Sequence, residues 1–358
     1  MSKKISTLAV GAKVRDLLSK YYGVPVGFQI ADKNHAGYPA NSTTLAAEKI
    51  LCLKAFDARE SGGNSDRQDY GNNRYSLANI RQWLNKSGTN WYQAQHSYDR
   101  APGSSYVWNG YNAYDTEAGF KTGFSPQFLA AILPTTLTVA KPTTDGGGSE
   151  TVTDDFFLPS KQEVGLGSEN GIAEGSLLAL FNSNNSSRLR TCTPQAIANS
   201  NYTNNPSSAA NWFWRLRSPS SGYAYSVRSV SSDGSEINYI HYASLGGVGV
   251  LPLCNLSSDT LVSDEPDSEG YYTIQWNQAP TTPPRHHRTG QRKERERRSD
   301  QLGGVHRPRK RRHHLPAGPM EQQHERMDHD LHRQQHQLYR HRHHHDDGQR
   351  AVARPREG

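Results

Sequence analysis

The sequence of 358 residues has few of the residues that cross-link a chain or anchor it in a bilayer. Its three cysteines, Cys52, Cys192 and Cys254, are widely separated and odd in number, so we expect buried free thiols and no disulfide framework or metal knuckle. No apolar run is long enough to span a membrane. The apolar run at residues 5–12 follows two lysines but is too brief for a signal-peptide core. We therefore expect no membrane partner.

Patterns typical of catalytic or cofactor sites are also missing. His35, His96 and His241 are too scattered to indicate a metal site or a triad. The glycine run at residues 145–149 lacks the Gly-Lys-Ser/Thr of a phosphate-binding loop. Asp154 and Asp155 are adjacent, so a strand would point them to opposite faces. The expectation is a protein that is not an enzyme, with no catalytic residue, metal or cofactor.

Charge and aromatic residues divide the chain into two parts. Residues 1–284 carry 22 Lys and Arg against 24 Asp and Glu, whereas residues 285–358 carry 19 against 10. The first part has all six Trp and all nine Phe, and Tyr339 is the only aromatic residue of the second. The first part can therefore bury a core, and the second is predicted to be a disordered His/Arg-rich tail.

Local patterns in the first part predict both strands and helices. Alternating apolar residues in "YGVPVGFQIAD" predict a strand. Ser76 is a candidate N-cap for a helix in "SLANIRQWLNKSG", and Ser125 is one for a helix in "SPQFLAAIL" with proline at its first position. "SKQE" at residues 160–163 resembles a capping box and predicts a further helix. The glycine run predicts a turn that leads into a strand toward Phe157.

These elements indicate one α+β domain over residues 1–264, followed by a linker at 265–284. Large apolar residues of the predicted helices and strands should form its core, namely Trp83, Phe128, Leu133, Phe157, Trp212 and Trp214.

A stretch rich in Tyr, Ser and Gly is the strongest indication of binding. Residues 221–247 read "SGYAYSVRSVSSDGSEINYIHYASLGG", with Asp233-Gly234 as a turn dipeptide. Tyrosine offers large, fairly rigid contacts, while Ser, Gly and Asn offer adaptable hydrogen bonds, as in antibody paratopes. The predicted ligand contacts are Tyr223, Ser226, Ser229, Ser231, Asn238, Tyr239 and His241. A Ser-rich hairpin around Asp233-Gly234 is the plainer interpretation, and it is compatible with a binding surface.

An ordered series of motifs resembles an uncharacterised family of phages and prophages of gut bacteria. The motifs are "NNRYSLANIRQWLN", "FSPQFLAAILPTTLTVAK", "FFLPSKQEVGL", "WRLRSP", "DGS" and "GVLPLCNLSSDTLVSD". The resemblance implies a C-type-lectin-like fold, shared with formylglycine-generating enzymes and with the variable proteins of diversity-generating retroelements. In that family the last motif is closer to "GVRPALNL", so Leu251 stands where arginine is usual and Cys254 where leucine is usual.

What the resemblance implies is recognition of a bacterial surface protein or glycan, as a tail-fibre or tail-tip component. The protein would then be found in the virion, or in the bacterial cytoplasm before assembly; the cell surface and a homo-oligomer are left open. In the retroelement systems, adenine-directed mutagenesis converts Asn-type codons into a set that includes Tyr, Ser, His, Ile, Asp and Gly, and residues 221–247 have this composition. An ordinary, undiversified binding loop is the alternative. A formylglycine-generating-like enzyme is a further alternative, although the cysteines match no such active-site pair.

The basic tail permits a different interpretation of its origin. "RHHRTGQRKERERR" would neutralise phosphates but has no interleaved aromatics, so a nucleic-acid partner is expected only if the tail is genuine. Synonymous codons for the tail, read one base later, can encode alternating strands with an early Trp and a late Trp-x-Val-Arg, a pattern that resembles a fibronectin type III-like domain. The hypothesis is an out-of-frame translation that begins near Pro283 and Pro284, and resequencing the gene there decides it.

Overall fold

Sheets make up most of the regular structure, and the α+β class predicted from the sequence is confirmed. The computed structural model describes residues 2–182, 184–236 and 241–276, all within one compact unit of the chain, Met1–Pro283. The second unit, Pro284–Gly358, lies outside the described residues. The predictions of a disordered tail and of an out-of-frame domain therefore fall outside them too.

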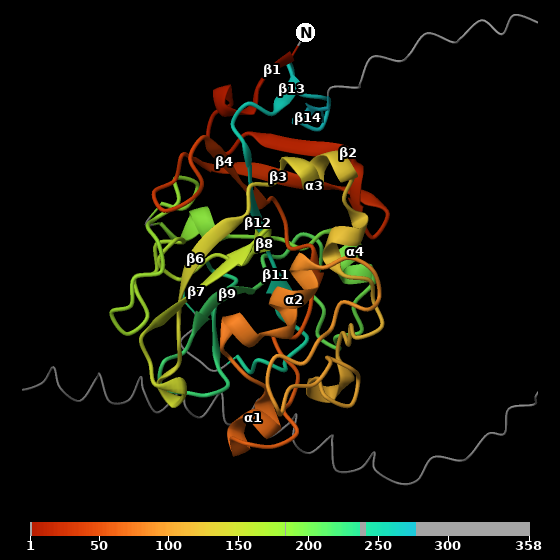
Figure 1. The fold of residues 1–358 in the computed structure, drawn as a ribbon. Helices are drawn as coiled ribbons and strands as arrows, with labels where there is room; N and C mark the ends of the chain where they lie inside the picture. The colour runs from red at the N-terminus through yellow and green to blue at the C-terminus, as the bar shows by residue number, and fades with distance from the viewer. Residues whose placement is uncertain (1, 183, 237–240, 277–358) are drawn as a thin grey trace, which may run out of the picture. The chain divides into compact units, whose positions relative to one another are not determined.

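Three sheets are present in the described residues. The largest has the spatial order β1 (Ser2–Lys4), β13 (Leu261–Ser263), β14 (Tyr271–Gln275), β2 (Lys13–Tyr21), β3 (Val24–Lys33), β4 (Ser42–Ala47), β12 (Leu253–Ser257) and β8 (Phe156–Phe157). The second has the order β10 (Val227–Val230), β9 (Trp214–Pro219), β11 (Gly249–Val250) and β5 (Cys52–Leu53). The third is the hairpin β6 (Thr135–Ala140) and β7 (Ser149–Asp154). Figure 1 shows β1, β13 and β14 at one end of the molecule and α1 (Ser65–Tyr70) at the opposite end.

The strand predicted from alternation is β3, and it is confirmed. Val26, Phe28 and Ile30 are buried, while the residues between them are only partly buried. One strand of the largest sheet lies where the sequence predicts a linker. This strand, β14, falls within residues 265–284 and pairs in parallel with β2. The described fold therefore continues past residue 264 to Trp276, and residues 277–284 lie outside the described part.

The α-helices of the described residues are short. They are α1, α2 (Asn79–Asn85), α3 (Pro126–Ala131) and α4 (Pro194–Ala198). The 3₁₀ turns are η1 (Ile5–Thr7), η2 (Tyr75–Leu77), η3 (Trp108–Gly110), η4 (Phe120–Gly123), η5 (Thr143–Asp145) and η6 (Asn185–Arg188). The Ser125 cap of α3 is confirmed, because its hydroxyl accepts a hydrogen bond from the Phe128 N–H at 3.1 Å. None of the helices in this part of the chain is long and apolar enough to cross a bilayer.

Two predicted helix starts, the Ser76 cap and the "SKQE" capping box, do not begin helices in the structure. Ser76 is not an N-cap: it lies in η2, its hydroxyl contacts Glu150, and α2 begins three residues later without a side-chain cap. The capping-box bonds of "SKQE" do form, since Ser160 N–H donates to the Glu163 carboxylate and Glu163 N–H donates to the Ser160 hydroxyl. However, they close a turn and no helix follows, because Gly165 and Gly167 have positive φ angles of 78° and 79°, which a right-handed helix cannot contain.

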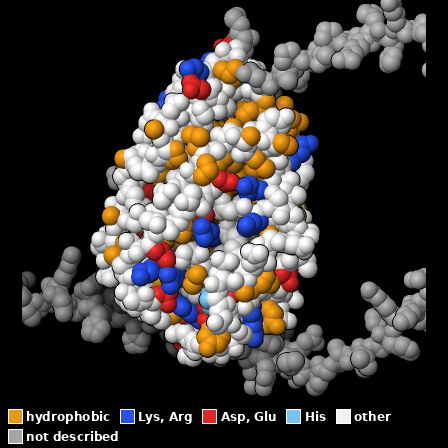
Figure 2. All heavy atoms as spheres, viewed as in Figure 1, with side chains coloured by type: hydrophobic (Ala, Val, Ile, Leu, Met, Phe, Trp, Pro, Cys, Tyr) orange, Lys and Arg blue, Asp and Glu red, His pale blue; other side chains and the backbone are white. Residues whose placement is uncertain are grey.

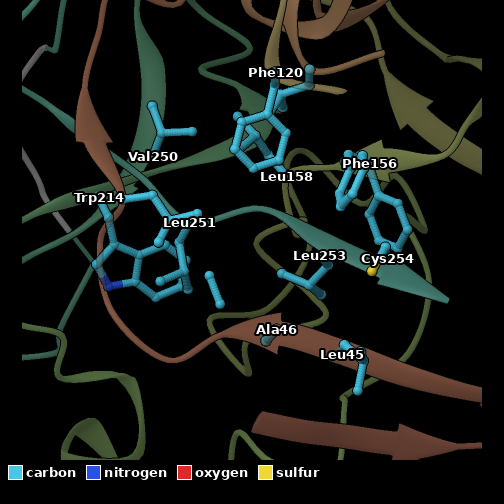
Figure 3. Packing of buried hydrophobic residues seen from close by; sticks show 14 of the residues in the cluster. Leu45, Ala46, Phe120, Phe156, Leu158, Trp214, Val250, Leu251, Leu253 and Cys254 are labelled. Carbon is cyan, nitrogen blue, oxygen red and sulfur yellow. The ribbon is translucent and has the colours of Figure 1, made fainter. Parts of the chain in front are cut away.

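Apolar side chains from both larger sheets and from α2 and α3 share one core. Four of the six predicted core residues are fully buried, namely Trp83, Phe128, Phe157 and Trp214. Leu133 and Trp212 are only half-buried, and Trp212 lies at the margin, where its indole N–H donates to the Gly247 carbonyl. Figure 3 shows Leu251, Leu253 and Cys254 in this core beside Trp214 and Phe156. The two unusual positions of the last motif are therefore apolar packing positions.

Candidate ligand-binding surface

The residues predicted to contact a ligand do not all reach the surface. Tyr223 is 46% exposed and Ser231 is half-buried, whereas Ser226, Ser229 and His241 are buried. Asn238 and Tyr239 lie outside the described residues. Asp233-Gly234 forms the expected turn, with Gly234 at a φ of +80° and its N–H bonded to the Ser231 carbonyl. The stretch at residues 221–247 thus contains both surface and supporting positions.

Tyrosine and tryptophan side chains from four segments meet at the surface beside the end of α1. We call this group the aromatic cluster, and it consists of Tyr70, Trp108, Tyr223, Tyr225 and Tyr242. The rings of Tyr70 and Tyr242 stack with centroids 4.3 Å apart, and the Trp108 ring lies 5.9 Å from Tyr70 and 5.2 Å from Tyr242. Tyr223 is exposed and the other four are half-buried. Tyr70 and Trp108 lie more than 100 residues before the Tyr-rich stretch and were not among the predicted contacts.

Backbone hydrogen bonds at Ser244 hold three of these segments together. The Ser244 N–H donates to the Tyr70 carbonyl at 2.8 Å, and its carbonyl accepts from the Trp108 N–H at 2.8 Å. Gly71 follows Tyr70 with a φ of +82°, and a Cβ there would lie 2.8 Å from the Asp57 carbonyl oxygen. The close approach of these segments therefore requires glycine at this position.

One asparagine fixes the turn that carries Tyr223. The side-chain amide of Asn73 donates to the carbonyls of Ser220 (3.3 Å), Tyr223 (2.7 Å) and Ser226 (2.8 Å). Arg67 supports the same turn through a bond of 3.1 Å to the Ala224 carbonyl. Asn73 of the "NNRYSL" motif thus holds the turn that carries Tyr223 in place, which is a structural role.

A single cation lies over the aromatic cluster in the described part of the chain. The guanidinium of Arg59 is 5.0 Å from the Trp108 ring centroid, in cation–π geometry. Burial lowers the pKa of Arg59, against the opposing effect of Asp69 and Tyr70. The surface therefore offers stacked rings, one positive charge and tyrosine hydroxyls, which suits ligands with C–H faces and hydrogen-bonding groups.

Beneath the cluster, a buried arginine anchors the segment that bears Tyr242. Arg215 is fully buried and donates from Nη2 to the carbonyls of Tyr242 (2.9 Å) and Leu245 (2.7 Å). Burial lowers its pKa to about 9. His241 lies close by, with Nδ1 3.1 Å from the Ser229 hydroxyl; burial, and then the charge of Arg215, lower its pKa to about 3. His241 is thus a neutral supporting residue at ordinary pH.

A buried ion pair connects two of the sequence motifs and has a structural role. Arg217 of "WRLRSP" forms a two-bond ion pair with Glu163 of "PSKQE", at 2.6 and 2.8 Å, and also donates to the carbonyls of Leu158 and Glu174. Burial alone would lower the pKa of Arg217, but the pairing with Glu163 outweighs it and the pKa is raised. These motifs therefore identify the fold and not the site.

The three cysteines are buried, and no metal-binding group is found in the described part of the chain. As predicted, all three cysteines are free and buried. Burial raises the pKa of Cys52 and of Cys192 to about 12, so neither supplies a thiolate at neutral pH. No group of three or more His, Cys, Asp and Glu residues among the described positions could hold a metal ion.

The geometry defines a sheet-dominated α+β protein that presents aromatic side chains at one end. Its residues 40–258 match a family described as a domain of unknown function (DUF6273), and because the match covers more than half of the sequence, the chain belongs to that family. No curated protein and no solved structure matches the chain. The match begins just before β4 and ends just after β12, so β1, β2, β3, β13 and β14 lie outside the matched residues, at one edge of the large sheet.

Proposed function

We propose that this protein is a recognition protein that binds its ligand through the aromatic cluster. The observation that carries the proposal is the convergence of five aromatic side chains from four segments, at a place where the backbone is fixed by Asn73, Ser244 and Arg215. Clustered aromatic residues on a rigid support are the typical anchors of binding hot spots, because they lose little conformational entropy on binding.

The biological setting we propose follows the resemblance to phage and prophage proteins. In this setting the protein is a host-recognition component with a C-type-lectin-like fold, and the ligand is a protein or glycan of a bacterial surface. The α+β architecture and an aromatic cluster with one exposed and four half-buried rings are compatible with it. If the stretch is diversified by a retroelement, variation should fall on surface positions such as Tyr223 and spare buried ones such as Ser229.

Cell and glycan binding by matched variants tests the proposal. Fluorescently labelled protein is applied to a panel of intact gut bacteria and to an array of their surface polysaccharides. A Tyr223→Ala/Tyr242→Ala variant should bind about a thousandfold more weakly than the unaltered protein, at about 2 kcal/mol for each anchor. Tyr272→Ala is the control, because Tyr272 is a half-buried tyrosine on β14, at the far end of the molecule from α1 (Figure 1).

Circular dichroism should show a native spectrum and a cooperative transition for the double variant, at a lower thermal midpoint because Tyr242 stacks on Tyr70. If the double variant keeps full binding to a ligand that the panel identifies, the binding surface lies elsewhere. If no bacterium or polysaccharide is bound at all, the host-recognition proposal itself is refuted.

A further inference from the structure

A polar pocket of about 330 Å³ lies in the described part of the chain, and Gly110 in its wall belongs to the same turn, η3, as Trp108 of the aromatic cluster. Its walls come from the segments after β5 and α4, from the turn between β2 and β3, and from the irregular segment around residues 104–117. Neither the aromatic cluster nor any of the contact residues predicted from the sequence lines it. The side chains that matter for its chemistry are those of Tyr22, Lys54, Ser104, Asn112, Glu117 and Ser200.

A buried ion pair forms part of the pocket wall. The Lys54 side chain is 1% exposed, and its Nζ lies 2.8 Å from each carboxylate oxygen of Glu117. The ammonium also lies 5.0 Å from the Trp83 ring centroid and 4.8 Å from that of Tyr114. The Glu117 side chain is 35% exposed, so its carboxylate is open to solvent while its partner is not. Such a pair adds little to stability on average, because desolvating the lysine offsets the attraction.

The pocket is preformed by hydrogen bonds to the backbone of its walls. The indole of Trp91 donates to the Glu117 carbonyl at 2.9 Å, and that of Trp83 donates to the Ala118 carbonyl at 3.0 Å. On the other side, Asn112 donates to the Ser200 hydroxyl at 3.0 Å and exchanges two bonds with Asn201, at 2.6 and 3.0 Å. The walls are therefore ordered before a ligand binds, so binding loses little conformational entropy of the protein.

The lining selects for a neutral, hydroxyl-rich ligand. Lys54 and Glu117 cancel each other's charge, so a ligand with a net charge would be left without a partner. A carboxylate accepts hydrogen bonds from hydroxyls, while serine hydroxyls both donate and accept. The Tyr22 side chain adds an aromatic wall that can cover a C–H face. The volume is near the lower limit of small-molecule sites, which favours a single ring over a chain.

We propose that this pocket binds one neutral sugar ring, either as a free monosaccharide or as the terminal unit of a glycan. Glu117 would accept hydrogen bonds from two ring hydroxyls, with Lys54 holding the carboxylate in place, and Ser200 would contact a third hydroxyl. The site is independent of the aromatic cluster and would add a second point of sugar contact to the protein.

Saturation-transfer NMR and calorimetry with free sugars test this proposal. The neutral probes are glucose, galactose, mannose and N-acetylglucosamine, and the charged probes are glucuronate and glucosamine. At least one neutral sugar should bind in the millimolar range, and the charged analogues more weakly. Methyl glycosides and a disaccharide ending in the same sugar separate the two sources, since only a terminal-unit site accepts the disaccharide with equal or better affinity.

Two variants of different design probe the pocket. Glu117→Gln removes the acceptor charge, and Ser104→Tyr fills the space from an exposed position without altering the ion pair. Both should weaken sugar binding at least tenfold, while Tyr223→Ala/Tyr242→Ala leaves it unchanged. The proposal is overturned if no neutral sugar binds, if charged sugars bind better, or if Ser104→Tyr binds as the unaltered protein does. Loss of sugar binding in the aromatic-cluster variant alone would move the site to that cluster.

Discussion

The burial of His241 predicts a loss of stability in mild acid. Its side chain lies under the aromatic cluster, bonded to Ser229 and with its ring 4.9 Å from that of Phe213, and its pKa falls from 6.5 to about 3 through burial and the nearby Arg215. The unfolded chain binds a proton near pH 6.5, but the folded chain does not until about pH 3. Stability from this group is therefore complete above pH 6.5 and is lost as the pH falls toward 3.

The magnitude follows from the two pKa values. Between pH 7 and pH 5, the unfolded histidine goes from about one quarter to almost fully protonated. The protonated fraction, integrated over this pH interval, amounts to about 1.4 pH units. At about 1.36 kcal/mol per unit, the free energy of unfolding should drop by about 2 kcal/mol over this interval. Other groups contribute with the opposite sign: burial raises the pKa of Asp57, and a raised carboxyl pKa increases stability as the pH falls.

The assay therefore compares two proteins. Urea unfolding, followed by tryptophan fluorescence, is measured at pH 7, 6 and 5 for the unaltered protein and for His241→Gln, which keeps a hydrogen-bonding group for Ser229. The stability difference between the two should shift by about 2 kcal/mol in favour of the variant from pH 7 to pH 5. A difference that stays constant over this range would refute a neutral, buried His241.

Three further predictions concern the fold. Glu163→Gln should destabilise the protein by about 3–5 kcal/mol in urea unfolding, because it leaves Arg217 buried without a countercharge; the exposed pair of Lys4 and Asp259 is the control, and Asp259→Asn should leave the urea midpoint unchanged. Gly71→Ala should lower the free energy of unfolding and weaken ligand binding together. Gly148→Ala is the control, also at positive φ but with nothing within 4 Å of an added Cβ, and it should lower the free energy of unfolding by only about 1 kcal/mol. Equal losses for the two variants would contradict the crowding at Gly71. All three thiols should resist a chromogenic disulfide reagent until the chain unfolds, and rapid reaction of one in the native state would show that it is accessible.

Local signals in the sequence predicted elements whose stabilisation is itself local. The alternation of Val26, Phe28 and Ile30 directly reports one buried face of a strand, and the Ser125-Pro126 pair reports a helix start. Ser76 was misassigned because its hydroxyl binds Glu150, which lies 74 residues further along the chain. A side chain that is suited to cap a nearby helix can instead form its hydrogen bond with a residue far away in the sequence. A single sequence does not reveal that distant residue.

The candidate site was only partly predictable for the same reason. Composition identified the Tyr-rich stretch, and Tyr223, near its start, is exposed. Composition does not tell which side of the stretch faces outward, so Ser229 and His241 were expected on the surface and are buried. Tyr70 and Trp108 join the cluster through backbone bonds to Ser244, and no pattern within their own segments indicates this contact.

The strand order at the added edge of the large sheet has a mechanical consequence. β1 and β14 both run antiparallel to β13, which lies between them, so β1 and β14 point in the same direction. A force that pulls on Ser2 and on Trp276 in opposite directions acts at the start of one strand and beyond the end of the other. It therefore loads the hydrogen bonds of this edge in shear, all at once, and does not open them one after another. A load applied between Ser2 and Trp276 is therefore resisted by strands that all lie outside the matched residues 40–258.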